Sequence, residues 1–348
     1  MNMSSELHRL AYTIVGAGAI GGTLAWHLAR AGYQVTLVDT DADHRAAIIL
    51  DGIVLERAGV REAQAVKDVF APHDCPPNQQ RVLLAVKANA TKSAGAWLAG
   101  HLAADGFVVS MQNGLNEWVL GAALGPDRVV GAFVDLFADV VAPGVIRDGG
   151  TGAIAIGEAE GPISERVRGI VTDLQAWGPA VATDNLLGYL WSKLGSGAML
   201  AATALADDTM ANLLDRHRDT AHALVREVFS IASARGITVE PFDAFDAYVY
   251  SPPVTSKAMS AATDRLVKWL STQPKDRTGI WRDIVIRHRP TEIPVQYAPV
   301  LEAADPTGIP VPVLRALLAE LAAVEEAPAS MSEDRLNRLD AIARGKAA

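Results

Sequence analysis

The chain has 348 residues, half of them hydrophobic and a fifth charged, which is enough for two domains with packed cores. Acidic residues outnumber basic ones by 40 to 31, the formal charge is −9, and no long basic run is present, so the composition argues against nucleic acid as a partner. The single cysteine, Cys75, has no second thiol and no metal-ligand spacing around it. We therefore expect no disulfide, no metal site and a reducing, cytoplasmic location.

Neither the N-terminus nor the apolar runs predict a targeting or membrane segment. The opening residues 1–10, "MNMSSELHRL", have no basic start and no long apolar region, so we expect a short tail rather than a signal peptide. A long apolar run over residues 186–206 is interrupted by Lys193 and diluted by glycine and serine. This run predicts a buried helix and no membrane span.

The first sixty residues predict a strand, a helix and a second strand. "AYTIVGAG" from residue 11 reads as a strand and tight turn, "AIGGTLAWHLARAG" as a helix ending at Gly32, and "YQVTLVDT" as the next strand. A strand, helix and strand in this order form a right-handed crossover unit, which predicts a parallel sheet.

Later segments divide the chain into two parts. Strands are predicted over 81–88, 106–114 and 128–148, and the alternation over 150–158 predicts antiparallel strands or an edge hairpin. From Asn185 onward helical periodicity takes over, as in residues 216–236 and 311–327. We predict an α/β fold, with a Rossmann-type dinucleotide-binding domain in residues 1–184 and an all-helical domain in residues 185–348.

A glycine motif lies between the first strand and the first helix. In "GAGAIGG", Gly16 allows a tight turn, Gly18 lets the backbone approach a diphosphate, and Gly21 lets the helix pack on its strand. The N–H groups at the start of the helix then bind the anion. The predicted cofactor-binding turn comprises Gly16, Ala17, Gly18, Ala19, Ile20 and Gly21.

Asp39 ends the second strand and bears on the choice of cofactor. A carboxylate at this place accepts hydrogen bonds from the adenosine ribose hydroxyls and repels a 2′-phosphate, which favours NAD. The nearby His44 and Arg45 reach a phosphate if the loop folds back, so NADP stays open. An alternative is that Asp39 only caps the strand end.

Six short motifs follow one another along the chain: "GAGAIGG", "LLAVKAN", "SMQNGLNE", "LWSKLGSGAM", "RPTEI" and "GIPVPVLRALL". In this order and at these spacings the chain resembles the ketopantoate reductase family, also called the 2-dehydropantoate 2-reductases. The resemblance implies a Rossmann domain, a helical domain, a substrate bound between them, and reduction of a 2-oxo acid with a nicotinamide cofactor.

The resemblance also assigns roles to single residues. It implies that Lys87 lies near the cofactor ribose, that Asn113 contacts the cofactor near its nicotinamide end, and that Glu292 faces them across the cleft. With Lys193 as the catalytic lysine, the implied catalytic set is Lys193, Glu292 and Asn113, and both Asn113 and Glu292 also contact the cofactor. The alternatives are a solvated charge for Lys87, an Asn-Gly turn for Asn113, and an acid in the first turn of a helix for Glu292.

The chemistry gives Lys193 a reason to lie among apolar residues. Hydride addition to a ketone builds negative charge on the oxygen, which needs a proton donor or a fixed cation. Desolvation disfavours an ammonium ion, so we expect burial to lower the pKa of Lys193 and a neighbouring Glu292 to offset part of that shift. The alternative is a lysine that extends from a helix face to water.

The chain departs from the family on the lysine's own helix face. The family presents asparagines four and eight residues after the lysine, where this chain has Gly197 and Ala201. The family's substrate-binding serine falls near Gly279, and Thr278 and Ser196 are its nearest replacements. We expect a substrate other than ketopantoate and a larger, more apolar pocket, with Ser196, Gly197 and Thr278 as substrate residues.

These observations predict an NAD(P)-dependent oxidoreductase that transfers hydride between nicotinamide and a 2-oxo or 2-hydroxy acid or related carbonyl compound. An opine-type or 3-hydroxyacid dehydrogenase is an alternative, although the histidine acid of such enzymes has no matching motif here. A dinucleotide sensor without catalysis is another. The expected partner is a small molecule, not nucleic acid or a membrane, and the sequence leaves open a homodimer.

Overall fold

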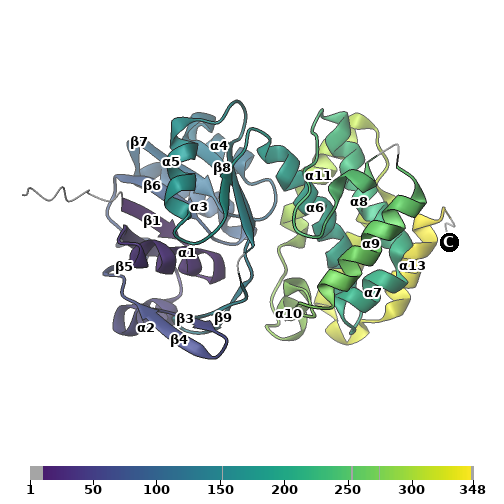
Figure 1. Cartoon of the computed structure of the whole chain (residues 1–348), viewed down its shortest axis with the longest axis horizontal. Coiled ribbons are helices and arrows are strands. Elements are labelled where there is room, and N and C mark those ends of the chain that lie inside the picture. Colours follow the sequence, from purple (N-terminus) through teal and green to yellow (C-terminus); the bar gives the residue numbers. More distant parts are fainter. Residues whose placement is uncertain (1–10, 151, 252–253, 274, 346–348) are drawn as a thin grey trace, which may run out of the picture. The chain divides into compact units, whose positions relative to one another are not determined.

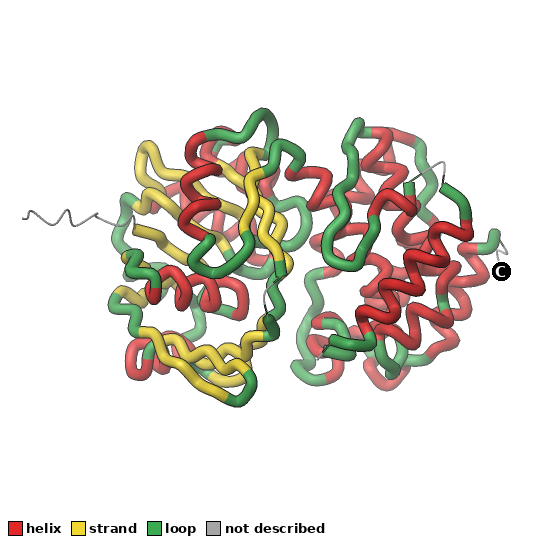
Figure 2. The backbone as a smooth tube through the Cα atoms, viewed as in Figure 1, coloured by secondary structure: helices red, strands yellow, loops and turns green. Residues whose placement is uncertain are grey.

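The computed structural model describes residues 11–150, 152–251, 254–273 and 275–345 (Figure 1). The chain divides into two compact units, Met1–Leu186 and Leu187–Ala348. Strands gather in the first unit and helices dominate the second (Figure 2). The tail predicted for residues 1–10 lies outside the described residues. Across the described ranges, no helix combines the length and apolarity needed to cross a membrane.

An eight-stranded sheet forms the centre of the first unit, in the order β12-β11-β8-β7-β6-β1-β2-β5. The six strands from β8 to β5 are parallel, β11 runs antiparallel to β8, and β12 is parallel to β11. The order of the six parallel strands is that of a Rossmann fold, and it reverses between β1 and β6. The predicted α/β class is confirmed. The strands are β1 (Ala11–Val15), β2 (Gln34–Val38), β5 (Asp68–Phe70), β6 (Gln79–Leu84), β7 (Leu102–Ser110), β8 (Val129–Asp135), β11 (Ala153–Glu158) and β12 (Ala180–Ala182).

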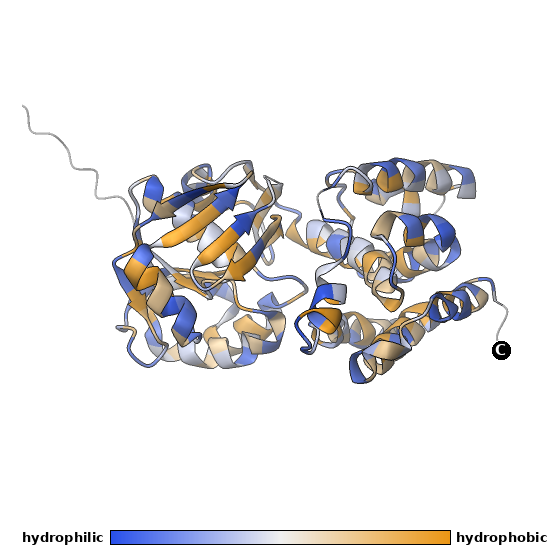
Figure 3. Ribbon diagram, turned by 90° about the horizontal axis from the view of Figure 1, so that it is seen from below, coloured by the Kyte–Doolittle hydropathy of each residue, from blue (hydrophilic) through white to orange (hydrophobic). Residues whose placement is uncertain are grey.

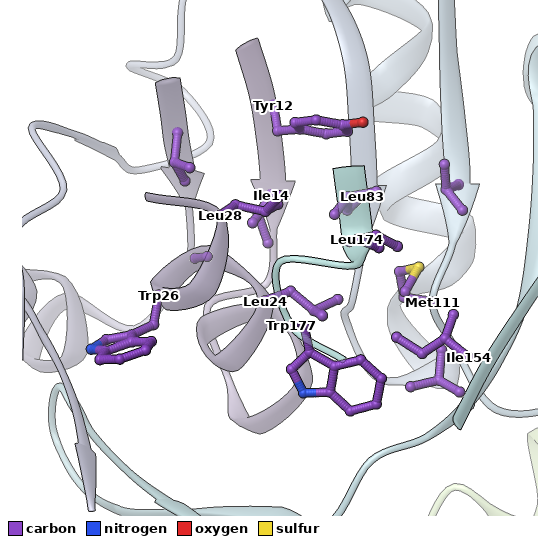
Figure 4. Packing of buried hydrophobic residues seen from close by; sticks show 14 of the residues in the cluster. Tyr12, Ile14, Leu24, Trp26, Leu28, Leu83, Met111, Ile154, Leu174 and Trp177 are labelled. Carbon is purple, nitrogen blue, oxygen red and sulfur yellow. The ribbon is translucent and has the colours of Figure 1, made fainter. Parts of the chain in front are cut away.

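Helices cover both faces of this sheet because its strands are apolar on both sides. Successive residues of a strand point to opposite faces, so Ile14 packs with α1 (Ala19–Arg30) and α5 (Glu165–Leu174). Its neighbour Val15 packs on the other face with α3 (Thr91–His101) and α4 (Glu117–Leu124). Figure 4 shows the first of these cores, where Leu24 and Trp177 meet below the sheet. In Figure 3 the strands of this unit are largely coloured as hydrophobic.

A smaller sheet in the order β4-β3-β10-β9 belongs to the same unit. The sequence predicted one strand over 128–148, but this segment contains β8, β9 (Ala138–Ala142) and β10 (Val145–Asp148), because Gly144 with φ +72° turns the chain between the last two. The hairpin of β3 (Ile53–Arg57) and β4 (Val60–Gln64) was not predicted. Helix α2 (Ala42–Asp51) precedes it.

The second unit is helical among its described residues, apart from an isolated bridge between Phe242 and Phe245. The predicted all-helical domain is therefore confirmed, and α8 and α12 lie within the segments predicted from periodicity. The helices are α6 (Leu186–Ala202), α7 (Met210–Arg216), α8 (Arg218–Ala234), α9 (Ser256–Leu270), α10 (Gly279–Val285), α11 (Ile293–Ala304), α12 (Pro312–Glu326) and α13 (Glu333–Ala343).

Candidate active site

The glycine turn joins β1 to α1 at the carboxyl edge of the large sheet. Gly16 has φ +93°, and a Cβ there would lie 2.9 Å from the backbone of Ala85 and Val86, so only glycine fits. A Cβ at Gly21 would lie 1.9 Å from the carbonyl oxygen of Gly16, so the helix packs directly on the turn. A Cβ at Gly18 would meet nothing within 4 Å. The first turn of α1 contains no acidic residue. An open helix N-terminus with no acidic residue in its own first turn fits a dinucleotide diphosphate.

Asp39 turns its carboxylate toward this same turn. Its Oδ2 accepts a hydrogen bond from the amide of Ala17 at 2.6 Å, and its Oδ1 accepts one from the amide of Asp41 at 2.8 Å. The amide of Ala17 is therefore engaged by Asp39 rather than directed at a diphosphate. Each carboxylate oxygen has a second acceptor site, so Asp39 can still accept hydrogen bonds from ribose hydroxyls.

His44 is fixed inside the unit, which corrects the expectation that it reaches a phosphate. Its side chain is buried, and its Nδ1 accepts a hydrogen bond from the amide of Gly144 at 3.0 Å. The proton must then be on Nε2, which donates to the carbonyl oxygen of Ala17 at 2.9 Å. Arg45 is half-buried and donates through Nη1 to the carbonyl oxygen of Asp39 at 2.8 Å. Of the two basic residues, only Arg45 has its charge beside the strand end.

Lys87 and Asn113 follow neighbouring parallel strands, so they lie at the same sheet edge as the glycine turn. Lys87 comes after β6 and directly before the 3₁₀ turn Ala88–Ala90, and it is half-buried. Asn113 is exposed in the turn after β7, next to Gly114 with φ +97°. The Gly16 turn packs on the backbone that leads into Lys87. The first unit thus brings its predicted cofactor residues to one edge.

In the second unit, α6 carries Lys193 at a half-buried position between the buried residues Ser192 and Leu194. Ser196 is 8% exposed, and its hydroxyl donates to the carbonyl oxygen of Lys193 at 3.1 Å. This hydroxyl is therefore occupied by its own helix. Ser192 is also buried, and its Oγ accepts a hydrogen bond from the amide of Glu240 at 2.9 Å.

Gly197 and Ala201 do not open the pocket in the way the sequence suggested. Ala201 is 0% exposed, so it borders no open space, and the expectation is wrong at this position. At Gly197 a Cβ would lie 3.0 Å from the hydroxyl of Tyr297. Tyr297 is buried and donates to the carbonyl oxygen of Leu194 at 2.7 Å. This tyrosine, which lies beside Gly197, was not predicted from the sequence.

Glu292 directly precedes α11 and does not cap it with its side chain. The loop before it is fixed by the buried Asp283, which accepts hydrogen bonds from Arg287 and Arg289 at 2.9 and 3.0 Å. Thr278 is 8% exposed, and its Oγ accepts from the amide of Trp281 at 3.1 Å. Thr278 therefore begins α10 as its N-cap.

Within the ranges that the structure describes, no group of three or more His, Cys, Asp or Glu side chains is arranged to hold a metal ion. At the sheet edge of the first unit, the backbone amides of the glycine turn, the carboxylate of Asp39, Lys87 and Asn113 are groups of the kinds that bind an organic cofactor.

Comparisons with known proteins agree along most of the chain. A family model described as "Ketopantoate reductase PanE/ApbA" matches residues 12–161, and one described as "Ketopantoate reductase PanE/ApbA C terminal" matches residues 185–325. A curated 2-dehydropantoate 2-reductase from Mesorhizobium japonicum is 29% identical over 332 residues, covering 88% of this chain and 95% of the relative.

Two solved structures have the same fold. A PanE/ApbA family ketopantoate reductase from Ralstonia eutropha has a TM-score of 0.76 at 26% identity, covering 91% of this chain and 98% of that one. A D-mandelate dehydrogenase, solved with NADH and anilino(oxo)acetate, has a TM-score of 0.77 at 18% identity, covering 94% and 99%.

Proposed function

Because the chain belongs to the ketopantoate reductase family, we propose that it transfers hydride between a nicotinamide cofactor and a 2-oxo acid or related carbonyl compound. It is an oxidoreductase acting on CH–OH groups. The observation that carries the proposal is the carboxyl edge of the parallel sheet. There the glycine turn, Asp39 and Lys87 follow β1, β2 and β6, at the point where the strand order reverses.

The residues at this edge would hold the dinucleotide through complementary groups. The N–H groups at the start of α1 bind the diphosphate, and the open space at Gly18 admits it. Asp39 accepts hydrogen bonds from the ribose hydroxyls, and Lys87 supplies a cation from the neighbouring strand end. Asn113 offers a side-chain amide near the nicotinamide. A bound reduced nicotinamide supplies the hydride.

We propose NAD rather than NADP as the cofactor. The carboxylate of Asp39, held by two backbone amides, places a negative charge where a 2′-phosphate would have to bind. His44 is buried and donates to Ala17, which leaves Arg45 as the nearby cation. Titrating the protein with NADH and with NADPH, followed by fluorescence, tests this choice. Tighter binding of NADPH would contradict it.

Lys193 acts as the proton donor during reduction. As hydride reaches the carbonyl carbon, the ammonium of Lys193 gives its proton to the carbonyl oxygen, so the product is an alcohol and the lysine is left neutral. Water then returns the proton. Glu292, which belongs to the same helical unit, completes the proposed catalytic set. In the oxidative direction the neutral lysine accepts the proton.

We propose that the substrate differs from ketopantoate, because the face of α6 that carries Lys193 lacks the family's side-chain amides. One turn after Lys193 the chain has Gly197, which offers no amide, and Ala201, two turns after the lysine, is buried and also offers none. Tyr297 occupies the space nearest to Gly197 and its hydroxyl is bonded to Leu194. The hydroxyls of Ser196 and Thr278 are the proposed substrate groups, although each already bonds within its own helix. We therefore propose a 2-oxo acid that does not need amide contacts at this face.

Loss of reduced-nicotinamide absorbance across a panel of 2-oxo acids, ketopantoate included, tests the activity. Lys193→Ala is expected to lower kcat by about 10² to 10⁴, the usual contribution of a general acid, while NADH still binds. Lys268→Ala, at an exposed position of α9, is the matched control. Full activity of Lys193→Ala would contradict the proton-donor role. Binding of NADH without turnover of any compound would identify a sensor, and good turnover of ketopantoate would contradict the proposed specificity.

A further inference from the structure

A chain of buried side-chain hydrogen bonds connects the turn that carries Lys87 to the turn that carries Asn113. Its members are Thr91, Gln112 and Asn116, which are 2%, 4% and 5% exposed. Thr91 begins α3, and the other two flank Asn113 in the loop after β7. The three residues lie on two different loops, so their bonds are tertiary contacts.

The available donors and acceptors determine the direction of each hydrogen bond in this network. Nε2 of Gln112 carries two protons and donates to the carbonyl oxygen of Val86 at 2.9 Å and to the hydroxyl of Thr91 at 2.8 Å. The hydroxyl of Thr91 has one proton, which is shared between the carbonyl oxygen of Ala88 at 2.8 Å and Oδ1 of Asn116 at 2.9 Å. Nδ2 of Asn116 then donates to the carbonyl oxygen of Asn113 at 2.8 Å.

These bonds hold the backbone on both sides of Lys87 and at Asn113 itself. The carbonyl groups of Val86 and Ala88 flank Lys87, and the third carbonyl is that of Asn113. A buried polar group without a partner costs about 1 to 3 kcal/mol. One end of this hydrogen-bonded network therefore cannot shift without leaving a polar group unpaired at the other end. The two loops are therefore constrained to move together.

We propose that Thr91 is a positioning residue, whose hydroxyl couples the Lys87 turn to the Asn113 turn so that both cofactor residues are presented in one fixed arrangement. Among Thr91, Gln112 and Asn116, it is Thr91 that bonds to both of the other two residues. It acts through the two loops and need not touch the dinucleotide. This inference rests on the proposed roles of Lys87 and Asn113.

Three substitutions test the coupling. Thr91→Val keeps the shape and removes the hydroxyl, and Thr91→Ser keeps the hydroxyl. Ser93→Ala is the matched control, because the exposed Ser93 also donates to a carbonyl of the same turn, that of Ala90 at 2.9 Å, but has no bond to the Asn113 loop. Thr91→Val loses the hydroxyl's bonds to both Gln112 and Asn116, and we expect a rise of about five- to tenfold in the Kd for NADH. Thr91→Ser and Ser93→Ala are expected within about twofold of the wild type.

A double variant separates positioning from a general loss of stability. If Thr91 acts through the Lys87 turn, then Thr91→Val changes NADH binding by less than about twofold once Lys87→Ala is present. Additive effects, or equal Kd values for Thr91→Val and Ser93→Ala, would overturn the inference. If Thr91→Val does not fold, Gln112→Met removes both donors of the same chain and must raise the Kd in the same way. Absence of an effect of Lys87→Ala would instead contradict the proposed function.

Discussion

Replacing Gly197 with alanine measures how tightly Tyr297 confines the helix face beside Lys193. Glycine inside a helix is normally about 0.5 to 1 kcal/mol less stable than alanine, so the change would stabilise an open position. Here the new Cβ would lie 3.0 Å from the tyrosine hydroxyl, which cannot retreat without losing its 2.7 Å bond to Leu194. Overpacking costs about 1 to 3 kcal/mol, so we expect a net loss of up to about 2 kcal/mol.

The effect of Gly197→Ala on stability should change sign when the hydroxyl of Tyr297 is removed. Tyr297→Phe gives up one hydrogen bond, about 0.5 to 1.5 kcal/mol, and also removes the atom that the new Cβ would meet. In that background Gly197→Ala is expected to stabilise by about 0.5 to 1 kcal/mol.

Calorimetry of the wild type, the two single variants and the double variant measures this cycle. Gly169→Ala is the control, since a Cβ at that position of α5 would meet nothing within 4 Å. If Gly197→Ala stabilises the wild-type chain as much as Gly169→Ala does, the reasoning is refuted.

Three further predictions concern the cofactor and pH. Asp39→Asn should improve binding of NADPH relative to NADH by about tenfold in fluorescence titrations, because the charge that repels a 2′-phosphate is gone; an unchanged ratio would contradict the role of Asp39. Burial raises the pKa of Glu117 from 4.5 to about 7. The contribution of this residue to stability is therefore present below pH 4.5 and is lost as pH rises through about 7. In urea unfolding, the free energy of unfolding of the wild type should fall by up to about 3 kcal/mol between about pH 5 and pH 8, and Glu117→Gln should remove this fall. An unaltered dependence on pH in the variant would contradict this role of Glu117. The hydrogen bond to Asp340, and a second one to Glu333, raise the pKa of His217, so these contacts stabilise α13 below pH 6.5 and less as pH rises past it. Asp340→Asn should weaken that dependence while Glu333 keeps part of it, and persistence of the same fall would exclude Asp340 as its cause.

Most of the large sheet was predictable because its signals are local, whereas the short edge strands β5 and β12 were not predicted. A strand, the glycine turn and a helix follow one another within residues 11–30, and the apolar runs of β6, β7 and β8 are continuous. The small sheet was not predictable in the same way. Its central pairing joins Val54 to Val145, and such a pairing leaves no periodic pattern in either segment. The hairpin turn at Ala58 and Gly59, with φ of 51° and 80°, was the available signal, but alanine at a positive φ is not a residue that marks turns.

The residues that position the candidate site were hidden from the sequence for a different reason. Tyr297, His44 and Thr91 each bond to a backbone carbonyl, and every residue supplies a carbonyl, so nothing in the sequence marks the acceptor. The side chain that donates the hydrogen bond gives only a weak signal in the sequence. A tyrosine on the buried face of α11 must find an acceptor for its hydroxyl, and the nearest helix face is the one that carries Lys193. Gly197 therefore does not mark the simple loss of a side chain. It is the residue that lets this hydroxyl approach α6, so the shape of this helix face depends on the glycine and the tyrosine together.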